Sequence, residues 1–190
     1  MGTFEQVSFN EGEYIYADTN IWLSFLGYNQ TGSDDAKQRN ASAKLISAIN
    51  NAGANIVVST LILGELRKTI VMNRFKANDC RRQEDIKRMR EIDEKKYNYI
   101  LGQALNDFES YRRKIMQDPA VLKKIIAPTS EGFDMSNELM RQYNLFGSMD
   151  ASQLATALEY GIDYFATFDK DFSNVVLPDI TILWHDIHNT

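Results

Sequence analysis

The stretch S-M-D-A-S-Q-L-A-T-A-L-E-Y-G-I-D-Y-F-A-T-F-D-K-D-F, residues 148–172, decides the fold class of this chain. Its first part has the apolar spacing of a helix, with Asp150 in the opening turn. A short apolar run then predicts a strand over residues 164–167, and two acids, Asp169 and Asp171, follow it at once. A helix that begins with a carboxylate and a strand that ends with two are typical of an α/β protein that gathers oxygen ligands.

Strands and helices alternate along the rest of the chain as well. Three further runs rich in β-branched and aromatic residues predict strands, over residues 13–17, 55–58 and 181–184. Apolar periodicity predicts helices over residues 21–26, 36–51, 97–115 and 136–144, and another that Ser59 or Thr60 would cap. This alternation predicts an α/β fold with a central parallel sheet flanked by helices.

Length and composition set the general bounds. A chain of 190 residues fits a single domain, 1–190, with room for a sizeable core. Its one cysteine, Cys80, excludes a disulfide within the chain and favours a reducing compartment. No apolar run reaches the roughly 18 to 20 residues of a membrane span, and the acidic N-terminus does not resemble a signal peptide. We therefore expect a cytoplasmic protein with no membrane partner.

The middle of the chain differs from the rest and predicts a helical insertion at about 78–129. Asp93 and Glu94 interrupt its apolar pattern, which predicts a break between two helices there. The stripe of the longer helix consists of Tyr97, Leu101, Ala104, Phe108, Tyr111 and Ile115.

Charge is distributed unevenly around this insertion. Residues 66–124 carry sixteen Lys and Arg against nine Asp and Glu, whereas the remaining residues carry five against seventeen. A basic segment beside an acidic remainder could attract phosphates next to a cation site. The alternative is an ordinary solvated helix surface of mixed charge, and the sequence favours neither.

Acidic residues recur at the predicted carboxyl ends of the strands. Asp18 follows the first strand, and Glu65 lies in the helix after the second. In a parallel sheet these ends share one edge, so the two would approach the three acids named above. Clustered carboxylates repel one another, and a cation offsets that cost. Oxygen donors favour Mg²⁺ or Mn²⁺ over zinc, and both histidines, His185 and His188, lie in the last six residues.

Three motifs in this order resemble the PIN domain, a nuclease family that includes the VapC-type toxins. They are Y-A-D-T-N, S-T-L-I-L-G-E-L, and D-A-S-Q-L-A-T-A followed by F-A-T-F-D-K-D-F. The resemblance implies a PIN-like, Rossmann-like fold. It also implies four catalytic and metal-binding acids, one further metal ligand and two supporting residues. The four catalytic and metal-binding acids are Asp18, Glu65, Asp150 and Asp169. The further metal ligand is Asp171, and the supporting residues are Asn20 and Thr167.

The same resemblance implies an activity and partners. The expected activity is metal-dependent hydrolysis of RNA phosphodiester bonds with Mg²⁺ or Mn²⁺, leaving 5′-phosphate and 3′-hydroxyl ends. Toxin members pair with an antitoxin protein, and dimers are common in the family, so an antitoxin and a homodimer are both partners to test. The insertion at about 78–129 is the departure, because compact toxin members lack one of that length.

Each acid also has a purely structural interpretation. Asp18 and Asp150 could each cap a helix, and Glu65 could be a solvated helix residue. Asp169 and Asp171 could be turn acids. Their joint occurrence at positions that match one family favours the metal site.

Two alternative functions remain beside the nuclease. A non-catalytic PIN-like module could bind RNA or protein through the insertion, although degenerate members usually lose acids that this chain keeps. A phosphatase of the haloacid dehalogenase kind is disfavoured, because position 20 is Asn where that class requires Asp. Trp22, Phe25 and Phe168 are expected in the core rather than as stacking platforms for bases.

Overall fold

Four parallel strands in the order β2-β1-β3-β4 form the sheet of the computed structural model, which describes residues 4, 7–28, 33–143 and 147–186. The strands are β1 (Tyr14–Ala17), β2 (Asn55–Val57), β3 (Tyr164–Thr167) and β4 (Thr181–Trp184). All four lie where the sequence predicts them, and the predicted parallel α/β architecture is confirmed. The strands are short apolar runs, as expected when helices cover both faces of a sheet.

The strand order places a topological switch between β1 and β3. The chain leaves β1 toward β2 on one side and returns through β3 on the other side. Ala17 pairs with Ala166 in this register, so both strands end at the same level. Ligands of open parallel sheets bind beyond the carboxyl ends of the strands at such a switch.

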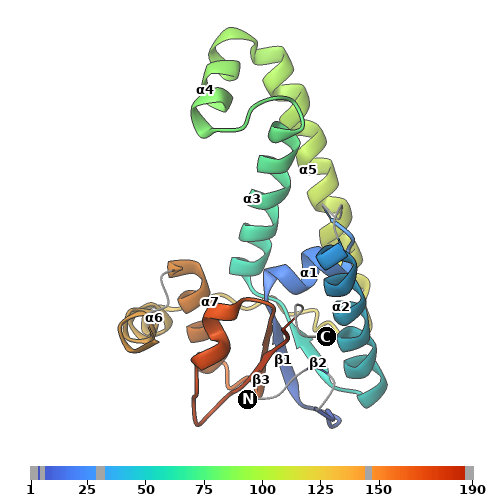
Figure 1. Ribbon diagram of the computed structural model, residues 1–190, viewed down its shortest axis with the longest axis vertical. Helices are drawn as coiled ribbons and strands as arrows, with labels where there is room; N and C mark the ends of the chain where they lie inside the picture. The colour runs from blue at the N-terminus through green and yellow to red at the C-terminus, as the bar shows by residue number, and fades with distance from the viewer. Residues whose placement is uncertain (1–3, 5–6, 29–32, 144–146, 187–190) are drawn as a thin grey trace. The chain divides into compact units, whose positions relative to one another are not determined.

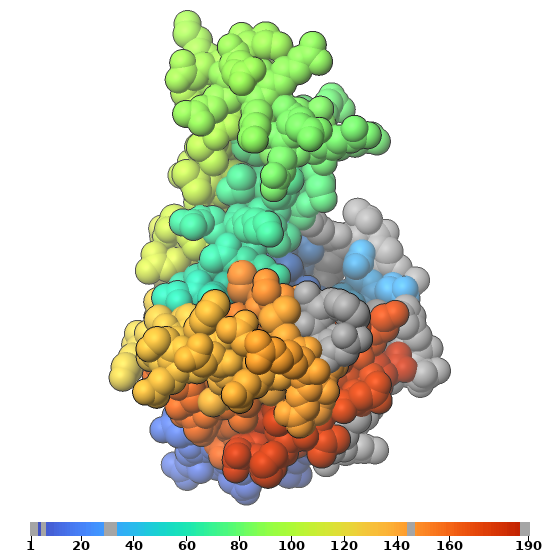
Figure 2. All heavy atoms as spheres, turned by 90° about the vertical axis from the view of Figure 1, so that its left-hand side faces the viewer, coloured from blue at the N-terminus to red at the C-terminus, as the bar shows by residue number. Residues whose placement is uncertain are grey.

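Helices flank the sheet in the first of two compact units, residues 1–62 and 116–190 (Figure 1). They are α1 (Thr19–Phe25), α2 (Ser33–Ala52), α6 (Ser130–Tyr143) and α7 (Ser148–Glu159), with a short 3₁₀ helix η1 (Lys170–Asn174). Figure 2 shows the segment of α6, in yellow to orange, at the surface of this unit. Gly161 ends α7 as predicted, with a φ of 62° that suits glycine.

Helix α6 begins at Ser130, six residues before the predicted start, and the predicted end at Asn144 lies outside the described residues. The earlier start has both a local and a tertiary cause. Glu159 of α7 accepts hydrogen bonds from the backbone N–H and the hydroxyl of Thr129, the residue before α6. The hydroxyl of Thr129 also accepts the backbone N–H of Glu131, so a local cap and a neighbouring helix together fix this terminus.

Stacked aromatic rings fill the core beside the sheet. Tyr16 and Phe165 lie on the adjacent strands β1 and β3 with ring centroids 5.4 Å apart, and Phe165 stacks in turn on Phe172. Trp22 is fully buried, as predicted. The expectation was wrong for Phe25 and Phe168, whose side chains are only partly buried.

The edge of the sheet at β2 is covered by a segment that the sequence did not reveal. Residues 120–126 run parallel to β2 as two isolated bridges, Ile56 with Val121 and Ser59 with Ile126. The backbone N–H of Ile56 donates to the carbonyl of Ala120 at 2.8 Å. This pairing satisfies groups that an open edge would expose.

The second compact unit, Leu63–Ile115, is helical. It contains most of α3 (Thr60–Lys76), α4 (Gln83–Ile92) and most of α5 (Glu94–Gln117). The break predicted at Asp93 and Glu94 is confirmed, because Asp93 ends α4 and its carboxylate accepts the backbone N–H of Lys96 in α5. The unit spans residues 63–115, and both the insertion at about 78–129 and the single-domain organisation of the chain stay predictions.

A small apolar cluster holds the second unit together. Phe75, Cys80 and Ile100 are buried in it, and Tyr97 packs its ring 5.4 Å from that of Phe75. Burial is the main cause that raises the pKa of the Cys80 thiol, which suits a structural cysteine. Arg74 and Asp107 add an ion pair at 2.5 Å. Among the described residues, no helix is both long enough and apolar enough to span a membrane.

Candidate active site

Asp18 stands at the carboxyl end of β1, where the strand turns into α1. Its backbone N–H donates to the carbonyl of Ala166 in β3 at 2.9 Å, which fixes it against the neighbouring strand. Its Oδ1 accepts the backbone N–H of Thr19 at 2.5 Å, so the carboxylate caps α1. Only 4% of the residue is exposed. A buried carboxylate is costly unless hydrogen bonds or positive charge compensate it, so this position is tightly specified.

Thr167, at the end of β3, connects Asp18 to Asp169. Its hydroxyl donates to Oδ2 of Asp18 at 2.8 Å and accepts the backbone N–H of Asp169 at 2.9 Å. Oδ1 of Asp169 accepts the backbone N–H of Asp171 at 2.9 Å, which caps η1. The structure therefore brings four of the predicted site residues into one hydrogen-bonded chain. Thr167 is fully buried, whereas Asp171 is exposed.

Asp150 lies in the first turn of α7 and is partly buried. Its carboxylate lies against the backbone of Gly147, since a Cβ added there would stand 1.9 Å from Oδ2 of Asp150. The first turn of a helix favours a negative charge, so the position of Asp150 is favourable for α7. Glu65 is partly buried in α3 and belongs to the second unit, so its approach to the other acids stays a prediction.

The donor chemistry of these residues fits a hard divalent cation, because Asp18, Asp150 and Asp169 all offer carboxylate oxygens. Within the residues that the structure describes, however, no three acidic, His or Cys side chains are grouped closely enough to hold a metal ion. The metal ligands therefore stay a prediction.

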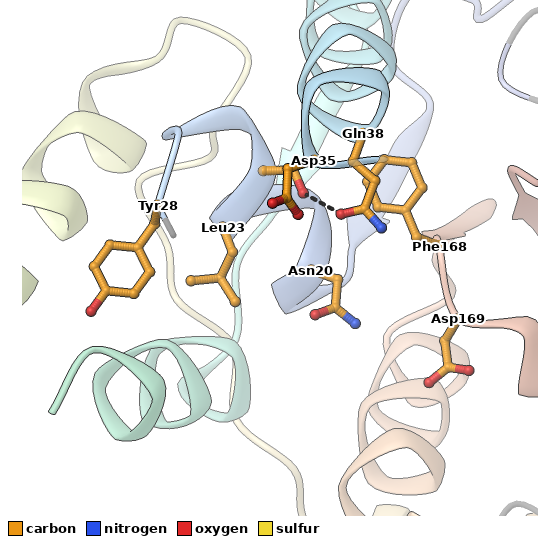
Figure 3. A pocket seen from close by; sticks show the side chains of 8 residues that line it. Asn20, Leu23, Tyr28, Asp35, Gln38, Phe168 and Asp169 are labelled. Atoms are coloured by element: carbon orange, nitrogen blue, oxygen red, sulfur yellow. Dashed lines mark hydrogen bonds between the residues drawn. The ribbon is translucent and has the colours of Figure 1, made fainter. Parts of the chain in front are cut away.

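A hollow of about 280 Å³ opens beside Asp169 (Figure 3). Two of the predicted residues, Asn20 and Asp169, line it. Sequence reasoning missed two other polar residues in its wall, Asp35 and Gln38 of α2. The sequence shows only that Asp35 and Gln38 share one face of a helix, because they are three residues apart. Only the packing of α2 shows that this face turns toward the hollow.

A family comparison matches this arrangement. The family model described as PIN domain matches residues 15–177, which is most of the chain. The chain therefore belongs to the PIN domain family. No curated protein matches the sequence.

Solved structures agree on the fold. The structure of VapBC2 from Rickettsia felis, bound to a DNA fragment from their promoter, is similar with a TM-score of 0.51 at 14% sequence identity, covering 91% of this chain and 99% of that one. The structure of FitAcB from Neisseria gonorrhoeae gives a TM-score of 0.52 at 15% identity, covering 93% and 99%. At such low identity these likenesses show a shared fold.

Proposed function

We propose that this protein is an endoribonuclease that hydrolyses RNA phosphodiester bonds with Mg²⁺ or Mn²⁺. The observation that carries the proposal is the chain of hydrogen bonds from Asp18 through Thr167 to Asp169, at the carboxyl edge of adjacent strands. Membership of a family of nucleases supports the same activity.

The roles proposed for the side chains follow from their contacts. Asp18 and Asp169 would hold the cation, and Asp150, Glu65 and Asp171 would complete its ligands as the family resemblance implies. Thr167 acts as a positioning residue, because its hydroxyl fixes one oxygen of Asp18 and the backbone of Asp169 together. Asn20 lines the hollow beside Asp169, where a substrate phosphate could accept its amide N–H.

A Mg²⁺ or Mn²⁺ ion bound there would supply Lewis-acid activation of water and of the scissile phosphate. The acidic residues of the site would repel the scissile phosphate without that ion, so cleavage should require the metal. The basic residues between 66 and 124 are proposed to attract the RNA backbone, which predicts an affinity that falls steeply with salt.

The test is cleavage of end-labelled RNA by the full chain with Mn²⁺ or Mg²⁺. Asp18→Asn and Asp150→Asn should each lower cleavage by about a hundredfold or more, the scale of losing a catalytic electrostatic group. Asp179→Asn is the matched control, since Asp179 is exposed and precedes β4, at the opposite edge of the sheet. Equal cleavage by all four proteins would refute the proposal.

Metal binding separates the nuclease from a non-catalytic module. Calorimetry should detect Mn²⁺ binding to wild type that Asp18→Asn and Asp169→Asn weaken and the Asp179→Asn control does not. Absence of carboxylate-dependent binding would favour the alternative, a PIN-like module that binds RNA or protein.

A toxin role and an antitoxin partner are proposals of the same kind, suggested by the VapC-type members of the family. Expression of wild type in bacteria should then arrest growth, whereas Asp18→Asn should not. Co-expression of the product of a neighbouring gene should restore growth if that product is the antitoxin. Sedimentation of the purified chain would decide between monomer and homodimer.

A further inference from the structure

We propose that the hollow beside Asp169 is a pocket that selects a guanine base of the RNA strand. The inference rests on the proposed nuclease function for the identity of the substrate. It concerns the walls of the hollow, which come from the first unit alone: α1 and the turn after it, α2, and the two residues that follow β3 (Figure 3).

The size of the hollow suits a single base. Its volume of about 280 Å³ lies just below the roughly 300–1,000 Å³ of pockets for drug-sized ligands. Tyr28 and Phe168 stand on opposite sides of it in the view of Figure 3. The ring of Phe168 is held by Phe4 and His185, with centroids 5.5 and 6.1 Å away. A ring held in this way is a platform on which an unpaired base can stack.

The polarity of the wall is set by Ser24 and Gln38. The hydroxyl of Ser24, which is buried, donates to Oε1 of Gln38 at 3.2 Å. This bond occupies one lone pair of Oε1 and orients the amide, so the donor that Gln38 offers to a ligand is its NH₂ group. An NH₂ donor favours bases with a carbonyl oxygen at that position, which are guanine and uracil, over adenine and cytosine, which carry an amino group.

Asp35 decides between the two remaining bases. It lies one turn before Gln38 on the same face of α2 and lines the same hollow. A carboxylate only accepts hydrogen bonds and has about four lone-pair positions for doing so. Guanine offers two adjacent donors, N1–H and the N2 amino group, next to its O6 acceptor. Uracil offers one donor between two acceptors, so it would place a carbonyl against the carboxylate.

The position of the pocket ties it to the scissile bond. A second hollow, of about 470 Å³, shares Gln38, Phe168 and Asp169 with the first. It is also lined by Lys170 and Trp184, a cation and an aromatic ring that suit a phosphate and a following base. The buried indole N–H of Trp184 has no hydrogen-bond partner among the described residues. A strand that crosses both hollows would pass directly over Asp169.

Binding of single nucleotides tests the pocket without relying on cleavage. Calorimetric or NMR titration should show guanosine monophosphate binding at least fivefold more tightly than the adenosine, cytidine and uridine monophosphates, the scale of one or two hydrogen bonds. Inosine monophosphate, which lacks the 2-amino group, should bind with intermediate affinity. Gln38→Ala and Asp35→Asn should each remove the preference. The controls are Asp34→Asn and Gln83→Ala, because both residues are exposed and neither lines the hollow.

Equal binding of the four nucleotides, no binding of guanosine monophosphate at millimolar concentration, or a preference kept by both variants would overturn the inference. Cleavage of RNA strands that contain a single guanine then tests whether the pocket binds a base of the substrate RNA or only a free nucleotide. Cleavage next to that guanine supports the inference, and a nucleotide preference with cleavage that ignores guanine overturns its assignment to RNA. If no RNA is cleaved at all, the proposed function fails, while the titration still decides whether the pocket selects guanine.

Discussion

Replacing Thr167 by valine should uncouple Asp18 from Asp169 with almost no change in volume. The hydroxyl of Thr167 donates to Oδ2 of Asp18 at 2.8 Å and accepts the N–H of Asp169 at 2.9 Å. A hydrogen bond to an ionised carboxylate contributes about 1.5–3 kcal/mol, and one between neutral groups about 0.5–1.5 kcal/mol. Losing both should lower the free energy of unfolding by about 2–4.5 kcal/mol. For a chain of this length, that corresponds to a fall in Tm of roughly 4–18 °C.

Two substitutions serve as controls for Thr167→Val. Thr167→Ser keeps the hydroxyl and removes one methyl group from a buried site, at a cost of about 1 kcal/mol. Thr156→Val removes another buried hydroxyl, but that hydroxyl donates to the carbonyl of Ser152 within the same helix, so no carboxylate loses a partner. Its effect on the free energy of unfolding should be about 1 kcal/mol or less.

Urea unfolding of the four proteins gives the free energies, and RNA cleavage gives the effect on the site. Thr167→Val should lose more activity than Thr167→Ser at a temperature where all the proteins are folded. Equal free energies of unfolding for Thr167→Val and Thr167→Ser would refute the reasoning, because the hydroxyl would then contribute nothing between Asp18 and Asp169.

Three further perturbations test contacts elsewhere in the first unit. A Cβ at Gly132 would stand 2.4 Å from Oε2 of Glu159, so Gly132→Ala should displace that carboxylate from the start of α6 and cost about 1 kcal/mol in urea unfolding. The same substitution in a Glu159→Ala background should cost less, and an equal cost would contradict this explanation. Gly147→Ala should push the carboxylate of Asp150 away from the start of α7 and lower RNA cleavage. The free energy of unfolding should stay within about 1 kcal/mol of that of wild type. Unchanged cleavage would show that the site does not need this placement of Asp150. Burial alone would raise the pKa of Glu13, but hydrogen bonds from the neighbouring asparagine outweigh it and lower the pKa below its usual 4.5. Because the folded pKa is the lower one, this stabilisation is present above about pH 4.5 and is lost as the pH falls through the folded value. Glu13→Gln should therefore lose stability less steeply than wild type in urea unfolding between about pH 5 and pH 3, and equal slopes would argue against the assignment.

Elements whose causes are local were predicted well from the sequence. The strands are short apolar runs, and the end of α7 follows from one residue, Gly161, whose positive φ few other residues adopt. The break before α5 likewise follows from the polar pair that interrupts the apolar stripe. The stripe itself was incomplete, because Ile100 is buried although the predicted pattern omits it. A helix face is wider than one row of residues, and neighbouring helices decide how much of it is covered.

Features that depend on a distant partner were missed. Helix α6 begins six residues before the start that apolar periodicity predicts, because Thr129 caps it and Glu159 of the following helix holds Thr129 in place. Phe168 was expected in the core because large aromatic rings are usually buried, yet it lines two hollows. Gln38 carries no signal of its own, because a glutamine on an amphipathic helix is ordinarily a solvated residue.

The sequence by itself determined the PIN family and its parallel α/β architecture, because the motifs and the alternation of strands with helices are local patterns. It also named the acids at the ends of the strands. Only the tertiary structure decided which of them meet: the strand order makes β1 and β3 neighbours, and the register then sets Thr167 between Asp18 and Asp169. The packing of α2 beside the residues that follow β3 likewise formed the hollow. Contacts between residues about 150 positions apart depend on how the strands pair, and no local pattern encodes them.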